Sequence, residues 1–154
     1  MQGRPKVLFL SRGNTARGQM AEGFLRSLAG ERFIAASAGV DPGTLHPIAI
    51  EVMDEVGVDI SRKEPKDVTH FWKEHFAYVV TLFDSARERS PVYPFSTNLR
   101  YWNLLDPAAV TGSLEERKAA FRRVRDQIRI NVLSFVAEIE AAATRPLSLA
   151  HARG

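Results

Sequence analysis

The stretch from Val7 to Glu22, VLFLSRGNTARGQMAE, constrains the fold more than any other part of this chain. The apolar run at 7–10 predicts a strand buried on both faces of a parallel sheet. A short polar loop follows, and from Ala16 onward the apolar residues have helical spacing. A buried strand, a tight loop and a helix N-terminus together favour anion binding. The first N–H groups of the helix have no internal partner, and the helix dipole favours negative charge there.

The loop has the residue types that an anion site needs. Arg17 stands at the start of the helix, where its guanidinium can bind two oxygens of a tetrahedral anion. Gly13 and Asn14 tolerate the left-handed backbone that aims successive N–H groups inward as a nest. A plain turn between a strand and a helix is the alternative. We predict an oxyanion site made of Ser11, Arg12, Gly13, Asn14, Thr15, Ala16 and Arg17.

Composition excludes several classes of protein. The chain has 154 residues, 45% hydrophobic and 25% charged, which is typical of one globular domain. We find no apolar run of about 18 residues and no signal peptide, so we expect no membrane span and a cytoplasmic location. The net charge is only +3, so we expect no nucleic-acid partner. Without any cysteine, the chain forms no disulfide and carries no thiol chemistry.

Strands alternate with helices along the chain, which predicts an α/β fold with a parallel sheet and helices on both faces. The predicted strands cover 7–10, 33–38, 76–82 and 99–103, and the predicted helices cover 16–28, 47–56, 66–73 and 114–143. Ser113 and Glu116 form a capping box that begins the last helix. We assign 1–143 to a single domain and 144–154 to a frayed tail that has lost the apolar periodicity.

Asp106 and Pro107 follow the last predicted strand. The carboxyl ends of parallel strands meet at one edge, so Asp106 is expected beside the anion loop. A carboxylic acid there can protonate a leaving-group oxygen, which makes Asp106 a candidate general acid; an ordinary Asp-Pro turn is the alternative. His46, His70 and His75 lack metal-site spacing, so we predict no metal and assign them surface or capping roles.

Several motifs resemble those of a known family. Five residues separate Ser11 from Arg17, the spacing of the Cys-x5-Arg signature of the cysteine phosphatases, with serine in place of cysteine. The stretch 7–22 is similar to the phosphate-binding loop of the low-molecular-weight tyrosine phosphatases and the related thioredoxin-coupled arsenate reductases. The likeness to the reductases is closer, and it continues in order through AASAG, VGVDIS, VVTL, DPA and FRRVRD. The resemblance covers nearly the whole chain and implies a four-stranded parallel sheet.

The resemblance also implies roles for single residues. Ser11 occupies the nucleophile position, and Arg17 that of the oxyanion-binding arginine. Asn14 matches a loop-shaping residue, and Asp106 matches the general acid. If position 11 carried a cysteine, the protein would be a single-thiol enzyme. It would then need an external thiol donor such as glutathione, mycothiol or thioredoxin.

Two departures from the family pattern matter. The two further cysteines of the thioredoxin-coupled enzymes correspond to about Phe83 and Ser90, and neither is a cysteine here. Some members of the family bind a monovalent cation near Asn14 and Glu22, with a further ligand near position 66. Here Lys66 stands at that position, and its ammonium group can replace the ion. We therefore predict no bound potassium and no cofactor.

Serine at position 11 changes the chemistry that this loop can perform. A hydroxyl stays neutral where a thiolate would form, and no histidine adjoins it in sequence to act as a base. Arsenate reduction takes two electrons from sulfur, which Ser11 cannot supply. We expect a protein that binds arsenate, phosphate or sulfate and is catalytically impaired as written.

Three alternatives stay open. Ser11 can be a trapping substitution in a working enzyme of the arsenate reductase type. It can equally belong to a natural, non-catalytic protein that binds an oxyanion or a phosphopeptide. A protein-interaction role through the irregular segment at 83–98 and the long basic helix is the third.

Overall fold

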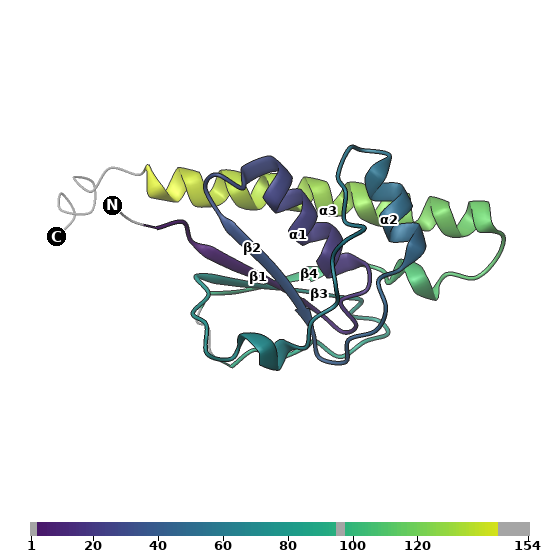
Figure 1. Ribbon diagram of the computed structural model, residues 1–154, viewed down its shortest axis with the longest axis horizontal. Helices are drawn as coiled ribbons and strands as arrows, with labels where there is room; N and C mark the ends of the chain where they lie inside the picture. Colours follow the sequence, from purple (N-terminus) through teal and green to yellow (C-terminus); the bar gives the residue numbers. More distant parts are fainter. Residues whose placement is uncertain (1–2, 95–97, 145–154) are drawn as a thin grey trace.

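The computed structural model of the protein describes residues 3–94 and 98–144 (Figure 1). Its elements in chain order are strand β1 (Lys6–Ser11), helix α1 (Arg17–Ala29), strand β2 (Ile34–Gly39), helix α2 (Pro47–Asp54), 3-10 helix η1 (Val68–Phe71), strands β3 (Tyr78–Phe83) and β4 (Leu99–Asn103), 3-10 helix η2 (Pro107–Ala109) and helix α3 (Leu114–Ala143). The predicted helix at 66–73 is only the short η1. The predicted tail at 144–154, apart from Thr144, lies outside the described residues, as do 95–97 of the irregular segment. Assignment of 1–143 to one domain stays a prediction.

The four strands form one parallel sheet, as predicted, and the structure gives their order as β2-β1-β3-β4. The chain passes from β1 to β2 on one side and then returns to add β3 on the other side of β1. This reversal makes the carboxyl ends of β1 and β3 a topological switch point, where α/β proteins bind ligands. The loop at 11–17 and the segment that follows β3 both begin at this edge.

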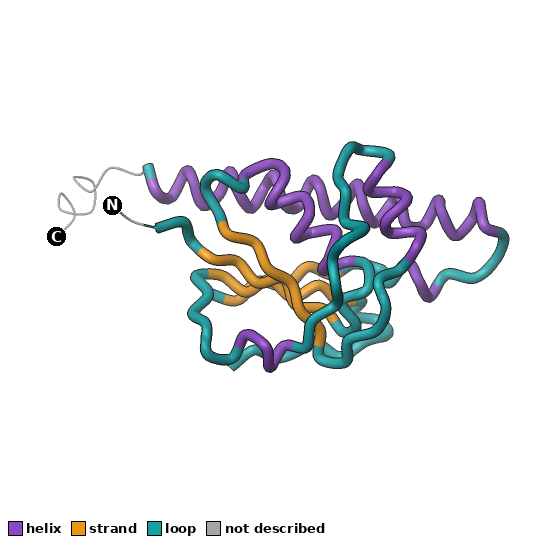
Figure 2. Tube along the Cα trace, in the orientation of Figure 1, coloured by secondary structure: helices purple, strands orange, loops and turns teal. Residues whose placement is uncertain are grey.

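Alternation along the strands divides the core between two faces of the sheet. Phe9 and Leu82 pack with α1, α2 and α3 on one face. Leu8 and Leu10 pack on the other face with Phe71 of η1 and with residues of the neighbouring loops. Figures 1 and 2 show the three α-helices on one side of the sheet and η1 on the opposite side. The predicted α/β fold is therefore confirmed. In the described part of the chain, the helix that covers the second face is the short 3-10 helix η1.

Local signals explain how the long helix begins. The Ser113 hydroxyl accepts a hydrogen bond from Glu116 N at 3.1 Å, and the Glu116 carboxylate accepts one from Ser113 N at 3.3 Å. The predicted capping box is thus confirmed. Within the described ranges, no helix is long and apolar enough to cross a membrane.

Ion pairs join α2 to α3 at the residue that follows α2. Glu55 accepts hydrogen bonds from Arg122 Nη2 at 2.8 Å and from Arg125 Nη1 at 2.7 Å. Arg125 Nη1 also donates to the carbonyl of Val52 in α2. The bonds from Arg122, assisted by Arg125, lower the pKa of Glu55 from 4.5 to about 2. A third of the Glu55 side chain is exposed, so solvent screens these charges.

We predict that Glu55→Gln lowers the free energy of unfolding near neutral pH by at most about 1 kcal/mol. The stabilisation from ionised Glu55 is complete above the pKa that this group has in the unfolded chain. This contribution is lost as the pH falls from about 4.5 toward about 2. Urea unfolding of both proteins across this range measures the difference between them. A difference that is independent of pH would contradict the assignment.

Candidate functional site

The loop after β1 is held by the segment that follows β2. Backbone N–H groups of this segment donate to the loop carbonyls, from Val40 N to Ser11 O (3.3 Å), Asp41 N to Arg12 O (2.9 Å), Gly43 N to Gly13 O (3.0 Å) and His46 N to Thr15 O (2.9 Å). The described residues contain no cis peptide bond, and in a trans peptide the N–H points away from the preceding C=O. Four N–H groups therefore point away from the 40–46 segment, into the interior of the loop: those of Arg12, Gly13, Asn14 and Ala16.

This arrangement has the donor pattern of a nest that binds an anion. Asn14 has φ 53°, the left-handed conformation that was predicted for it. The same prediction for Gly13 was wrong, because its φ is not positive. The carbonyl of Gly13 instead accepts the hydrogen bond from Gly43 N. One left-handed residue is therefore enough to turn the backbone here.

Ser11 and Asn14 form the buried floor of the loop. The Ser11 hydroxyl accepts a hydrogen bond from Asn14 N at 3.2 Å, and the two residues are 2% and 1% exposed. A Cβ atom at Gly18 would lie 2.9 Å from Asn14 Oδ1 and 3.0 Å from Ser11 Oγ. Glycine at position 18, in the first turn of α1, therefore leaves room for the side chains of Ser11 and Asn14.

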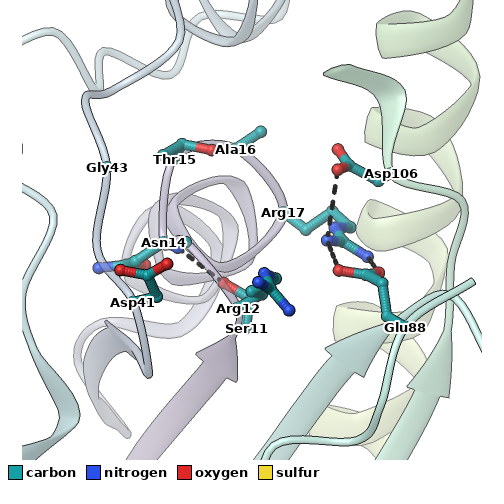
Figure 3. Close-up of a pocket in the computed structure, with 11 residues that line it drawn as sticks. Ser11, Arg12, Asn14, Thr15, Ala16, Arg17, Asp41, Gly43, Glu88 and Asp106 are labelled. Atoms are coloured by element: carbon teal, nitrogen blue, oxygen red, sulfur yellow. Dashed lines mark hydrogen bonds and ion pairs between the residues drawn. The ribbon is translucent and has the colours of Figure 1, made fainter. Parts of the chain in front are cut away.

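Arg17, the first residue of α1, is buried and held by two carboxylates. Its Nη1 and Nη2 donate to Glu88 Oε1 and Oε2 at 2.5 and 2.9 Å. Nη1 also donates to the carbonyl of Leu104 at 3.2 Å, and Nη2 lies 3.9 Å from Asp106 Oδ2. Figure 3 shows the guanidinium between Glu88 and Asp106. A buried arginine needs such partners, because an unpaired buried charge is costly.

Asp106 forms the Asp-Pro turn considered from the sequence, and its role as a general acid stays a prediction. Its Oδ1 accepts from Ala108 N at 3.0 Å and caps η2, which is ordinary Asp-Pro turn chemistry. Its Oδ2 faces Arg17. The side chain is 36% exposed and borders the cavity, so a proton on it can reach a bound ligand.

All of the predicted site residues line one cavity of about 240 Å³. The cavity is bordered by the whole loop from 11 to 17 and by Asp106, as Figure 3 shows. Sequence reasoning missed its three other lining residues, Asp41, Gly43 and Glu88. Glu88 lies in the irregular segment at 83–98, which was considered only for a protein-interaction role. The available signal is a carboxylate in the segment after a strand next to β1, whereas the family pattern points only to cysteine positions in this segment.

A second charged cluster surrounds Glu22 of α1. Its carboxylate accepts from Ser37 Oγ at 2.7 Å and pairs with Lys63 Nζ at 2.7 Å. The lysine in contact is thus Lys63, whereas Lys66, which was predicted to replace a cation, acts on Glu22 through its charge. Burial raises the pKa of Glu22, against the opposing effects of Ser37 and Arg26. No group of three or more potential metal ligands occurs among the described histidines and carboxylates, and absence of potassium stays a prediction.

His46 has the capping role that was predicted for the histidines. Its Nδ1 accepts a hydrogen bond from Ile48 N at 3.1 Å at the start of α2, and its ring packs on Phe121 with centroids 4.7 Å apart. Burial lowers the pKa of His46, and the charge of Arg117 adds to this effect. His46 therefore fixes α2 at the end of the segment that holds the loop.

Comparison with known proteins decides the family. The model of the low molecular weight phosphotyrosine protein phosphatases matches residues 6–145. The chain belongs to this family. An arsenate reductase of Shouchella clausii is 38% identical over 130 residues, 84% of this chain and 93% of the relative.

Solved structures of the phosphatase family agree with this assignment. An arsenate reductase in the phosphate binding state superposes with a TM-score of 0.74 at 32% identity, over 88% of this chain and 98% of the other. The thioredoxin-dependent arsenate reductase of Corynebacterium glutamicum gives a TM-score of 0.70 at 25% identity, over 92% of this chain and 64% of the other. The resemblance stated from the sequence motifs is thus confirmed.

We predict that Gly39→Ala disrupts the loop. A Cβ atom at Gly39 would lie 2.8 Å from Arg12 O and 3.0 Å from Asn14 N, both backbone atoms that cannot rotate away. The expected loss is about 1–3 kcal/mol in the free energy of unfolding, measured in urea. Gly3→Ala is the matched control, because nothing lies within 4 Å of a Cβ atom there. Equal stability of the two variants would refute this account of Gly39.

Proposed function

We propose that the loop at 11–17 binds a tetrahedral oxyanion of the arsenate and phosphate class. The observation that carries the proposal is the direction of the loop peptides: four carbonyls, those of Ser11, Arg12, Gly13 and Thr15, are bonded outward to the 40–46 segment. Of the N–H groups that face inward, that of Asn14 is bonded to the Ser11 hydroxyl, and the others can bind an anion within the loop. Support also comes from relatives that are named arsenate reductases, one of them solved in a phosphate binding state.

The proposed roles of the side chains follow from their places around the cavity. Arg17 supplies the charged fork that binds two oxygens of the anion. The Ser11 hydroxyl lies at the floor of the loop, at the position that the family likeness assigns to the nucleophile. Asp106, at the rim, is placed to give a proton to a leaving oxygen.

With serine at position 11, we expect binding without efficient turnover. Among the described residues, no base is hydrogen-bonded to the hydroxyl, which accepts a hydrogen bond from Asn14 N. Oxygen cannot donate the electron pair that reduces arsenate. The same hydroxyl is neutral, so it does not repel a dianion as a thiolate would.

We predict that the protein binds sulfate and phosphate saturably, and that Arg17→Ala weakens this binding by about 100-fold. Each charge-assisted hydrogen bond contributes about 1.5–3 kcal/mol, and tenfold in affinity is about 1.4 kcal/mol. Titration calorimetry measures both proteins. Arg123→Ala removes the same charge from an exposed position of α3 and serves as the control. Unchanged binding in Arg17→Ala would refute the proposed site.

We predict that Ser11→Cys raises activity from background to measurable turnover. A thiol at this place has its pKa lowered by the helix N-terminus and Arg17. With arsenate, its sulfur and an external thiol supply two electrons and end as a disulfide. We therefore expect arsenate reduction that depends on added glutathione, mycothiol or thioredoxin, and hydrolysis of aryl phosphates without them.

Two further variants control this experiment. Ser11→Ala should keep anion binding and gain no turnover. Adding Asp106→Asn to Ser11→Cys should slow aryl phosphate hydrolysis by about 100-fold or more, the usual loss when a general acid is removed. Absence of any gain in Ser11→Cys with arsenate, aryl phosphates and all three thiols would refute an enzyme-type site.

A further inference from the structure

Glu88 holds Arg17 with the same geometry by which an arginine holds an oxyanion. Both carboxylate oxygens of Glu88 accept from the two terminal nitrogens of Arg17, at 2.5 and 2.9 Å. Arginine forks bind phosphate and arsenate groups through these same paired donors. A ligand that uses both nitrogens of Arg17 must therefore compete with Glu88.

The remaining contacts of Arg17 leave only one terminal hydrogen for such a ligand, the one on Nη2 that faces Asp106 at 3.9 Å. Each terminal nitrogen has two hydrogens. Nη1 donates to Glu88 and to the carbonyl of Leu104, and Nη2 donates to Glu88 and faces Asp106. Leu104 contributes a backbone carbonyl that is fixed by the chain. Glu88 is the group that a rotation of its side chain can remove.

The turn that carries Glu88 does not depend on Arg17 for its fold. It begins at the end of β3, beside the loop at 11–17. Glu88 N and Arg87 N both donate to the carbonyl of Asp84, at 2.8 and 3.0 Å. These backbone bonds of the turn are independent of Arg17. The Glu88 carboxylate also accepts a hydrogen bond from Asp84 N at 2.7 Å, so a carboxylate that rotates away from Arg17 gives up this bond as well.

Charge around the cavity shows what Glu88 does to an incoming anion. The cavity is lined by two cationic side chains, Arg12 and Arg17, and by three carboxylates, Asp41, Glu88 and Asp106. Burial opposes ionisation of Glu88, but hydrogen bonds from Arg17 and Asp84 N keep its pKa below the ordinary value. With every lining carboxylate ionised, the lining has a formal charge of −1, which repels a dianion.

We propose that Glu88 is a built-in competitor that occupies Arg17 until an oxyanion displaces it. This proposal rests on the proposed function, because it assumes that the loop at 11–17 is the oxyanion site. It makes Glu88 a residue that sets the affinity threshold of the site. The site retains only an anion whose combined binding to the nest and to Arg17 outweighs the bond between Glu88 and Arg17.

Calorimetry with sulfate tests the proposal, because sulfate is a tetrahedral dianion whose charge is constant near neutral pH. Glu88→Gln keeps the shape of the side chain and removes its charge. We expect the variant to bind sulfate at least tenfold more tightly than the unaltered protein, and its thermal unfolding midpoint to fall, because buried Arg17 loses its charged partner. Glu31→Gln, at an exposed position just beyond the far end of α1, should bind as the unaltered protein does.

A third variant separates occupation of Arg17 from general repulsion. Asp41→Asn removes one negative charge from the same cavity, and Figure 3 shows Asp41 beside Asn14, away from Arg17. An equal gain in Asp41→Asn and Glu88→Gln would overturn the proposal, since charge alone would explain it. Weaker binding in Glu88→Gln would also overturn it and make Glu88 a support for Arg17. Absence of sulfate binding in both Glu88→Gln and the unaltered protein would instead refute the proposed function.

Discussion

The hydrogen bonds between the 40–46 segment and the carbonyls of the 11–17 loop are the constraint on which the site depends. They join backbone to backbone and orient the loop peptides so that N–H groups face inward. These bonds form because β2 pairs in register with β1, which brings Gly39 opposite Ser11. Gly39 then lets the two backbones approach more closely than a side chain would allow. The sheet register therefore determines the shape of the anion loop.

Burial of Arg17 links stability to ligand binding. A guanidinium that is 5% exposed must be paired in the folded chain, and Glu88, Asp106 and the carbonyl of Leu104 provide the partners. The same groups line the cavity in which we propose that an oxyanion binds. Because the folded chain already pairs Arg17, a ligand has to compete with these partners for its guanidinium. The proposed role of Glu88 follows from this requirement.

The parts of the fold that the sequence predicted best are those specified by local patterns. The apolar run at 7–10, the stripe of α3 and the capping box at Ser113 need only neighbouring residues to act. The helix predicted at 66–73 is only η1, which buries Val68 and Phe71 against the sheet. Lys63 rather than Lys66 reaches Glu22, since the path of a loop decides which lysine comes close. Spacing cannot distinguish two cations three residues apart.

By itself, the sequence determined the content of the site: a strand, a loop and a helix in succession, Arg17 at the helix start, and a hydroxyl without any thiol at position 11. These features are local, so adjacent residues specify them. Only the tertiary structure decided which way the loop peptides face and which group Arg17 holds. The bond from Arg17 to Glu88 joins residues 71 positions apart, and the bonds to the loop carbonyls come from another strand connection. Contacts of this kind depend on how the strands pair, and strand pairing is not written in the pattern of any single segment.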